Sequence, residues 1–242
     1  MVERLVLAVV DRMEAENISS GNMHEEYIYA LTGMLEKWIT LLSVVLMATF
    51  LGQLKLTLIF MIFFLTLRKR TGGFHAEHFY QCYLGTLAVV AAMTYLYPLA
   101  AEHINVTYAV LAIAIAVIIV IGTVNHPNID MSGDELKESR KAARWLLAIE
   151  IMVIAMSLMI NIDKLYISSM AVAIILCAIL MGLAKIFKQE VRMDEKIEKV
   201  ELGTLKLLEE VASREMKVHG WDWPPACSAI FHQPKRPKSM KK

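Results

Sequence analysis

The sequence of 242 residues lacks most of the features that mark secreted, metal-binding and nucleic-acid-binding proteins. Its formal net charge is only +1, so nothing indicates nucleic acid as a partner. The three cysteines, Cys82, Cys177 and Cys227, are far apart and without CxxC spacing, which argues against a disulfide framework. The apolar stretch within residues 1–10 is too short and too charged for a signal peptide.

Long uncharged apolar runs dominate the chain instead. Hydrophobic residues make up 57% of it and charged residues only 20%, which excludes a disordered chain, a collagen-like chain and an ordinary soluble enzyme. A bilayer core about 30 Å thick needs roughly 20 apolar residues per helix, or somewhat fewer where flanking residues snorkel. We therefore predict an all-α membrane protein with six transmembrane helices, near residues 38–53, 54–67, 83–101, 106–124, 145–160 and 165–184.

The distribution of basic residues predicts how these spans are oriented. If the amino terminus is cytoplasmic, the cytoplasmic segments hold 23 of the 25 lysines and arginines, and only Lys55 and Lys164 lie on the other side. Loops rich in Lys and Arg stay on the cytoplasmic side of a membrane. Both termini are therefore predicted to be cytoplasmic.

Two segments are expected outside the six spans. Residues 1–36 are typical of an interfacial helix followed by a turn near residues 19–22. Residues 194–218 have an amphipathic pattern, which fits a helix on the inner membrane surface or a helix packed on the bundle. Residues 232–242 are basic and broken by prolines, so we expect them to be disordered when free.

The residues with the most chemical potential lie between the second and third spans. A pair of glycines at residues 72–73 permits positive φ and predicts a break in the helix. His75, His78 and Cys82 follow, next to three basic residues. Cationic neighbours lower the pKa of a thiol, and a nearby histidine can act as its base. The pattern predicts an activated thiol at a membrane boundary.

Spacing alone leaves the identity of the base open. In a straight helix His78 is one turn from Cys82, whereas His75 is separated from it by about 10 Å of rise, too far for a hydrogen bond. His78 is slightly favoured on that ground, and His75 becomes the partner only if the chain bends after the glycines. Two alternatives remain: a metal site made by the two histidines and the cysteine, and interfacial histidines beside a packed cysteine.

The same residues resemble the signature of a known family, accessory gene regulator B (AgrB). Its members are bacterial membrane cysteine endopeptidases that process quorum-sensing peptide precursors. The residues that carry the resemblance are Arg68, Gly72, Gly73, His75, Ala76 and Cys82. The resemblance implies that Cys82 is the nucleophile and His75 its base, with Arg68, Gly72 and Gly73 shaping the site. It therefore also implies that the segment is bent.

The end of the chain resembles the precursors that this family processes, the AgrD or cyclic lactone autoinducer peptides. In these precursors an amphipathic helix precedes a cysteine-containing core and a charged tail that is removed. The corresponding parts here are a helix over residues 194–218, a core over residues 227–231 and a tail over residues 232–242. The resemblance implies cleavage between Phe231 and His232, with Cys227 closing a thiolactone ring.

Together the two resemblances predict a fusion of proteins that are normally separate, with a peptidase over residues 1–192 and a precursor over residues 193–242. We expect a multi-pass protein of a bacterial cell membrane, with its active site on the cytoplasmic side. No metal or other cofactor and no nucleic acid is expected, and a homodimer is left open. The alternatives are a transporter or export component, and a scaffold that binds the peptide without cleaving it.

Overall fold

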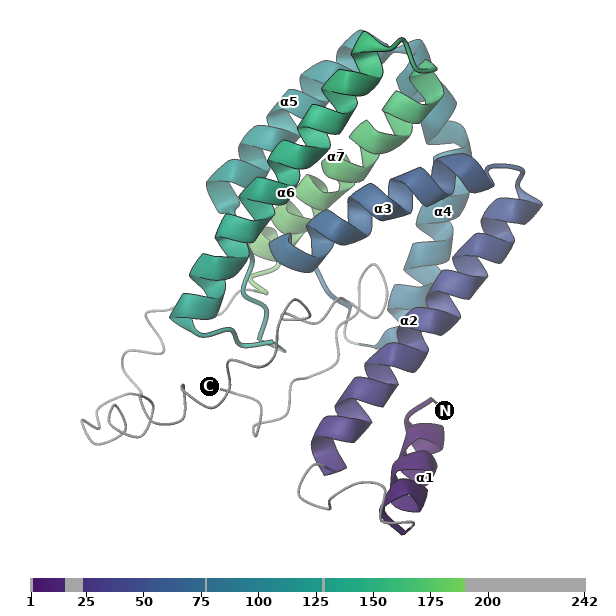
Figure 1. Ribbon diagram of the computed structural model, residues 1–242, viewed down its shortest axis with the longest axis vertical. Helices are drawn as coiled ribbons and strands as arrows, with labels where there is room; N and C mark the ends of the chain where they lie inside the picture. The colour runs from purple at the N-terminus through teal and green to yellow at the C-terminus, as the bar shows by residue number, and fades with distance from the viewer. Residues whose placement is uncertain (1, 16–23, 77, 128, 190–242) are drawn as a thin grey trace.

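The computed structural model describes residues 2–15, 24–76, 78–127 and 129–189, and these residues form an all-α structure without strands (Figure 1). The helices are α1 (Val2–Ala15), α2 (His24–Phe50), α3 (Leu54–Thr71), α4 (Phe79–Glu102), α5 (Ile104–Ile121), α6 (Gly133–Met159) and α7 (Lys164–Ile186). The predicted all-α class is confirmed. The turn expected near residues 19–22 and the precursor-like segment, residues 193–242, lie outside the described residues.

The central helix is α7, which contacts α3, α4, α5 and α6. Its buried positions include several small residues, Ser168, Ser169, Ala171, Ala173, Ala178 and Ala184. Within a membrane, helices associate through close packing, and small residues let their backbones approach. The hydroxyl of Ser169 donates a hydrogen bond to the carbonyl of Leu56 in α3, at 2.7 Å. In Figure 1, α3 runs obliquely between the α5–α7 group and α2.

Five of the helices, α2, α4, α5, α6 and α7, are long and apolar enough to cross a membrane. In α3, Lys55 near the start and Arg68, Lys69 and Arg70 in the last turn leave too little uncharged length for it to join them. Each of the six predicted spans nevertheless coincides with a helix. The membrane character of the chain is confirmed, whereas a sixth crossing by α3 and the cytoplasmic position of the termini stay predictions.

Two helices begin well before the spans that hydropathy predicts. Helix α2 begins at His24 rather than near residue 38, and α6 begins at Gly133 rather than near residue 145. At α6 a capping box accounts for the early start, because Ser132 N donates to Glu135 Oε2 at 2.8 Å and Glu135 N donates to Ser132 Oγ at 3.4 Å. Part of the basic loop expected before the fifth span is therefore helix.

The interfacial helix expected at the amino terminus corresponds to α1, which packs against α2. Val6 and Val10 of α1 are buried, while the charged residues Asp11 and Arg12 are exposed. The helix is therefore amphipathic, as a position at the membrane interface requires. That position stays a prediction.

Candidate active site

The chain leaves its helical path between α3 and α4 at the glycine pair. Gly72 has φ +65° and Gly73 has φ +131°, values that residues with a side chain rarely adopt. The next helix, α4, begins at Phe79. The predicted break is confirmed. The straight helix through His75 that the spacing argument assumed is therefore wrong, whereas the choice between His75 and His78 as the base stays a prediction.

The side chain of Arg68, in the last turn of α3, binds main-chain carbonyls of the bent segment and so holds it in place. The side chain is only 1% exposed, and its guanidinium donates from Nη1 to the carbonyl of Gly72 and from Nη2 to the carbonyl of Phe74, the second at 2.5 Å. A Cβ atom on Gly73 would collide with Nη1. Gly73 is therefore needed for the close approach of the guanidinium, whose planar fork reaches two acceptors at once.

The loop between α5 and α6 packs against the same segment. Val124 N donates to the carbonyl of Thr71 at 2.8 Å, and Thr123 Oγ1 donates to the carbonyl of Arg70 at 3.0 Å. These contacts give partners to carbonyls that the end of a helix leaves unsatisfied. A Cβ atom on Gly72 would lie 2.6 Å from the carbonyl oxygen of Val124. Both glycines are thus required by crowding as well as by their φ values.

His75 is held through its main chain and contacted at its ring. The residue is 2% exposed. Its N–H donates to Gln189 Oε1 at 3.0 Å, and Gln189 Nε2 donates to its carbonyl at 2.9 Å. The His75 ring lies edge to face with the ring of His126, at 4.8 Å between centroids. His75 lies in the segment between α3 and α4, which we call the joint. Gln189 at the end of α7 and His126 in the loop after α5 both contact it there.

His126 is a site residue that the sequence did not indicate. Burial, and then the positive charge of Arg68, lower its pKa from 6.5 to about 4. His126 is therefore neutral at physiological pH and adds no positive charge beside His75.

His78 and Cys82 lie at the start of α4. His78 is the residue that caps the helix, and its exposed ring stacks on the ring of Tyr80, with 5.6 Å between centroids. Cys82 lies in the first turn, where its N–H donates to the carbonyl of His78 at 3.3 Å, and it has no exposed surface. The positive end of the helix dipole favours negative charge at such a position.

A comparison with protein families decides what this arrangement belongs to. The model of the family described as accessory gene regulator B matches residues 7–186. The chain belongs to the accessory gene regulator B family. It is accordingly a membrane protein involved in the processing of autoinducer peptides. Neither the curated proteins nor the solved structures gave a match.

The region matched to the AgrB family contains α2 to α7 and the whole joint between α3 and α4. It ends before residue 193, so the likeness of the later residues to AgrD stays a prediction. Cys227, Phe231 and His232 lie outside the described residues.

The metal-site alternative finds no support in the described part of the chain. Within it, no three His, Cys, Asp or Glu side chains lie close enough together to hold a metal ion. At the joint the two histidines lie in different surroundings, because His75 is buried whereas His78 is exposed.

Proposed function

We propose that this AgrB-family protein is a cysteine endopeptidase that cleaves an autoinducer precursor, with Cys82 as the nucleophile and His75 as its base. The observation that carries the proposal is the buried, doubly held His75 in the bent segment ahead of the helix turn with Cys82. In a straight helix about 10 Å of rise would separate the two residues. The break at the glycines removes that constraint.

The neighbouring residues act as positioning residues in this proposal. Arg68 fixes the path of the segment through two carbonyls, and Gly73 leaves room for its guanidinium. Gln189 holds the main chain of His75, while His126 contacts the ring. A general base works only within hydrogen-bond reach of its proton, so small displacements of His75 have a large effect on rate.

The proposed reaction begins when His75 takes the proton of the Cys82 thiol and the thiolate attacks the carbonyl carbon of Phe231. The tetrahedral intermediate collapses as His75 gives that proton to the amine of His232, and the C–N bond breaks. The products are a thioester on Cys82 and a free peptide, residues 232–242. Cys227 then loses its thiol proton to His75 and attacks the thioester, which closes the thiolactone and returns Cys82 to a thiol.

The energetics of the two steps differ. Exchange of one thioester for another is nearly neutral, whereas conversion of an amide to a thioester is uphill. Loss or degradation of the released peptide would therefore draw the first step forward. Fusion of precursor and peptidase raises the effective concentration of the substrate at the site.

The basic residues support a cytoplasmic site. The joint, the start of α6 and the end of α7 lie at one end of the bundle, since Ser139 Oγ donates to the carbonyl of Arg70 and Phe74 N donates to the carbonyl of Leu180. That end also carries Lys185 of α7, and the other end carries few basic residues. By the positive-inside rule we assign the site to the cytoplasm and α3 to a sixth crossing.

Intact mass spectrometry of the full chain in detergent or membranes tests the proposal. We expect the wild type to lose residues 232–242 and Cys82→Ala to keep them. Cys177→Ala is the matched control, because Cys177 is also fully buried but packs inside α7 against the carbonyl of Phe64. Retained cleavage in Cys82→Ala would contradict the proposed nucleophile.

A second variant separates cleavage from ring closure. Cys227→Ala should still release the tail, but its acyl-enzyme can end only in hydrolysis, which leaves a product one water heavier than the corresponding thiolactone. If the wild type stays intact even with a separately supplied precursor, the protein is a scaffold or an export component. Transport of a precursor-derived peptide by Cys82→Ala would identify the export component.

A further inference from the structure

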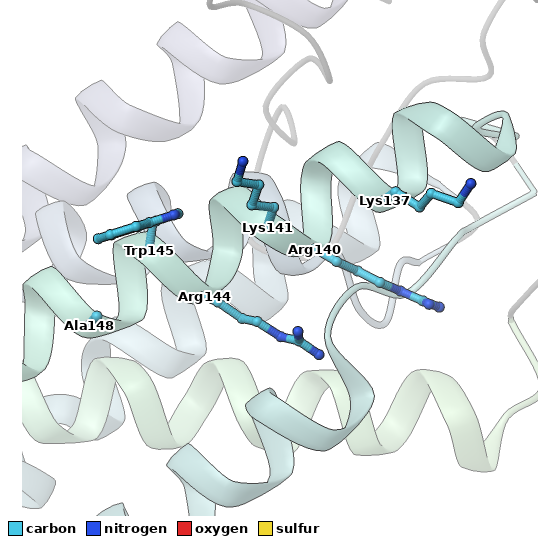
Figure 2. A pocket seen from close by; sticks show the side chains of 6 residues that line it. All are labelled: Lys137, Arg140, Lys141, Arg144, Trp145 and Ala148. Carbon is cyan, nitrogen blue, oxygen red and sulfur yellow. The ribbon is translucent and has the colours of Figure 1, made fainter.

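The first half of α6 carries an open groove lined by basic side chains. Its volume is about 510 Å³, and Figure 2 shows the lining side chains on successive turns of the one helix. The lining residues are Lys137, Arg140, Lys141, Arg144, Trp145 and Ala148. No acidic side chain is among them, so the groove presents four positive charges with an aromatic ring at its end.

These charges have little compensation within the described residues. Lys137 pairs with Asp134 at 3.3 Å, in an ion pair exposed to solvent on both sides. No ion pair in the described ranges involves Arg140, Lys141 or Arg144. Like charges three and four residues apart on a helix repel one another, so an anion in the groove would relieve that repulsion. Arginine in particular binds phosphate oxygens through two parallel hydrogen bonds.

The character of this helix face changes at Trp145. The residues before it are basic, whereas the exposed residues that continue the face are Ala148, Met152 and Met156. Trp145 is 65% exposed and Met152 is 56% exposed. Tryptophan is enriched where a membrane helix passes from the headgroup region into the hydrocarbon. A ligand that matches this face needs a negative headgroup next to an apolar chain.

The groove is anchored close to the candidate active site. Arg140 packs its stem on Gly122 at the end of α5, where a Cβ atom would lie 3.1 Å from Cγ of the arginine. Ser139, the preceding residue, donates to the carbonyl of Arg70 in α3. The loop after Gly122 carries His126 to the ring of His75.

We propose that this groove is a binding site for an anionic membrane phospholipid, with the phosphate among Arg140, Lys141 and Arg144 and an acyl chain along the apolar continuation of α6. Charge complementarity selects the anionic headgroup, and the apolar face beyond Trp145 selects a lipid over free phosphate or an acidic peptide. The site does not depend on the peptidase activity, so each can fail without the other.

The test compares lipids on the purified full chain in detergent. Phosphatidylglycerol is the anionic probe, and phosphatidylcholine with the same acyl chains is the zwitterionic control. Native mass spectrometry should show tighter binding of phosphatidylglycerol, which should also raise the thermal unfolding midpoint because it binds the folded state. Equal binding of the two lipids would overturn the proposal. It would also be overturned if inorganic phosphate alone raised the unfolding midpoint as much as phosphatidylglycerol does.

A matched pair of double variants locates the site. Lys141→Gln/Arg144→Gln should weaken phosphatidylglycerol binding roughly 30-fold, from the usual contribution of a basic side chain at an anionic membrane surface. Lys185→Gln/Lys188→Gln removes the same charge from exposed positions at the same end of the bundle, and should bind like the wild type. Equal losses in the two variants would indicate general charge attraction and overturn the site.

The competing occupant is an acidic segment of this chain. A carbodiimide, which joins amines to neighbouring carboxylates, tests it in lipid-free detergent. We expect Lys141 to form no more cross-links to residues 194–215 than Lys188 does. Preferred linkage of Lys141 to a carboxylate within residues 194–215 would assign the groove to the chain itself and overturn the lipid.

Discussion

Two joints in this protein each contain a glycine with a similar positive φ, but in opposite surroundings. Between α2 and α3, Gly52 has φ +69° and a Cβ atom there would have nothing within 4 Å. Between α3 and α4, Gly72 has φ +65°, yet a Cβ atom there would meet the carbonyl of Val124, and one on Gly73 would meet Arg68. The first joint only turns the chain, whereas the second is packed from several sides.

A positive φ alone therefore does not distinguish the two joints, whereas crowding around the missing Cβ atom does. At Gly52 a substitution is opposed only by the backbone preference of L-residues. At Gly73 the same preference adds to a collision with a buried guanidinium that holds two carbonyls. The following predictions test whether the packed joint, and not the turn itself, carries the activity.

The largest effect is expected at the histidine inside the packed joint. His75→Ala should slow tail release between about 100- and 10,000-fold, the usual contribution of a general base. His78→Ala, three residues later and exposed, should leave the rate near that of the wild type. Time courses of the released peptide by mass spectrometry compare the two. Full cleavage by His75→Ala together with loss in His78→Ala would reverse the assignment.

A methyl group on the crowded glycine should have the next largest effect. Gly73→Ala is expected to displace Arg68 and slow processing about 100-fold, because a shift near 1 Å at a catalytic group has an effect of that size. Gly52→Ala is the matched control, with a loss of about 1 kcal/mol in stability and unchanged processing. If both variants release the tail at the same rate, the crowding at the second joint has no role in catalysis.

Removal of the main-chain support of His75 should have a smaller effect. Gln189→Ala leaves one N–H and one carbonyl of the segment without their partner, and roughly a tenfold loss of rate is expected from that. Gln189→Glu keeps the acceptor but loses the donor, so its processing rate should lie between that of Gln189→Ala and that of the wild type. Measured rates that rank Gln189→Glu below Gln189→Ala would contradict a role in hydrogen bonding.

The smallest effect at neutral pH is expected for His126, and it should grow as the pH falls. The unfolded chain gains a proton at this residue below pH 6.5, whereas the folded chain gains it only near pH 4. Acidification through that window therefore favours unfolding, by about 2 kcal/mol at about pH 5.

Thermal unfolding in detergent tests this dependence on pH. His126→Asn should lose less stability than the wild type between neutral pH and about pH 5, because the depressed pKa is removed. His103→Asn, an exposed histidine at the joint between α4 and α5, is the control. An identical pH dependence in the two variants would refute the role of burial at His126.

Local sequence patterns predicted the helices and the residues of the joint, but not what packs on that joint. Each span predicted from hydropathy coincides with a helix, yet hydropathy missed the first turns of α2 and α6, where charged residues such as Glu25, Glu36 and Glu135 lie. For α6 the spacing of Ser132 and Glu135 carries the signal of a capping box.

His126 and Gln189 could not be found in this way. Gln189 lies 114 positions from His75 in the sequence, and no local period connects residues that meet only after the helices pack. Spacing could not decide between His75 and His78 for a related reason, and that choice stays a prediction. Spacing assumes a straight helix, whereas Arg68 and the glycines bend this one.

The complete burial of Cys82 has a consequence for how the protein meets oxidants. Oxidation and alkylation of a thiol require access to its sulfur, and Cys82 offers none while this end of the bundle stays closed. An opening that admits a peptide also admits a small thiol reagent. The rate at which such a reagent labels Cys82 therefore measures how often the closed state opens, and a bound precursor should change that rate.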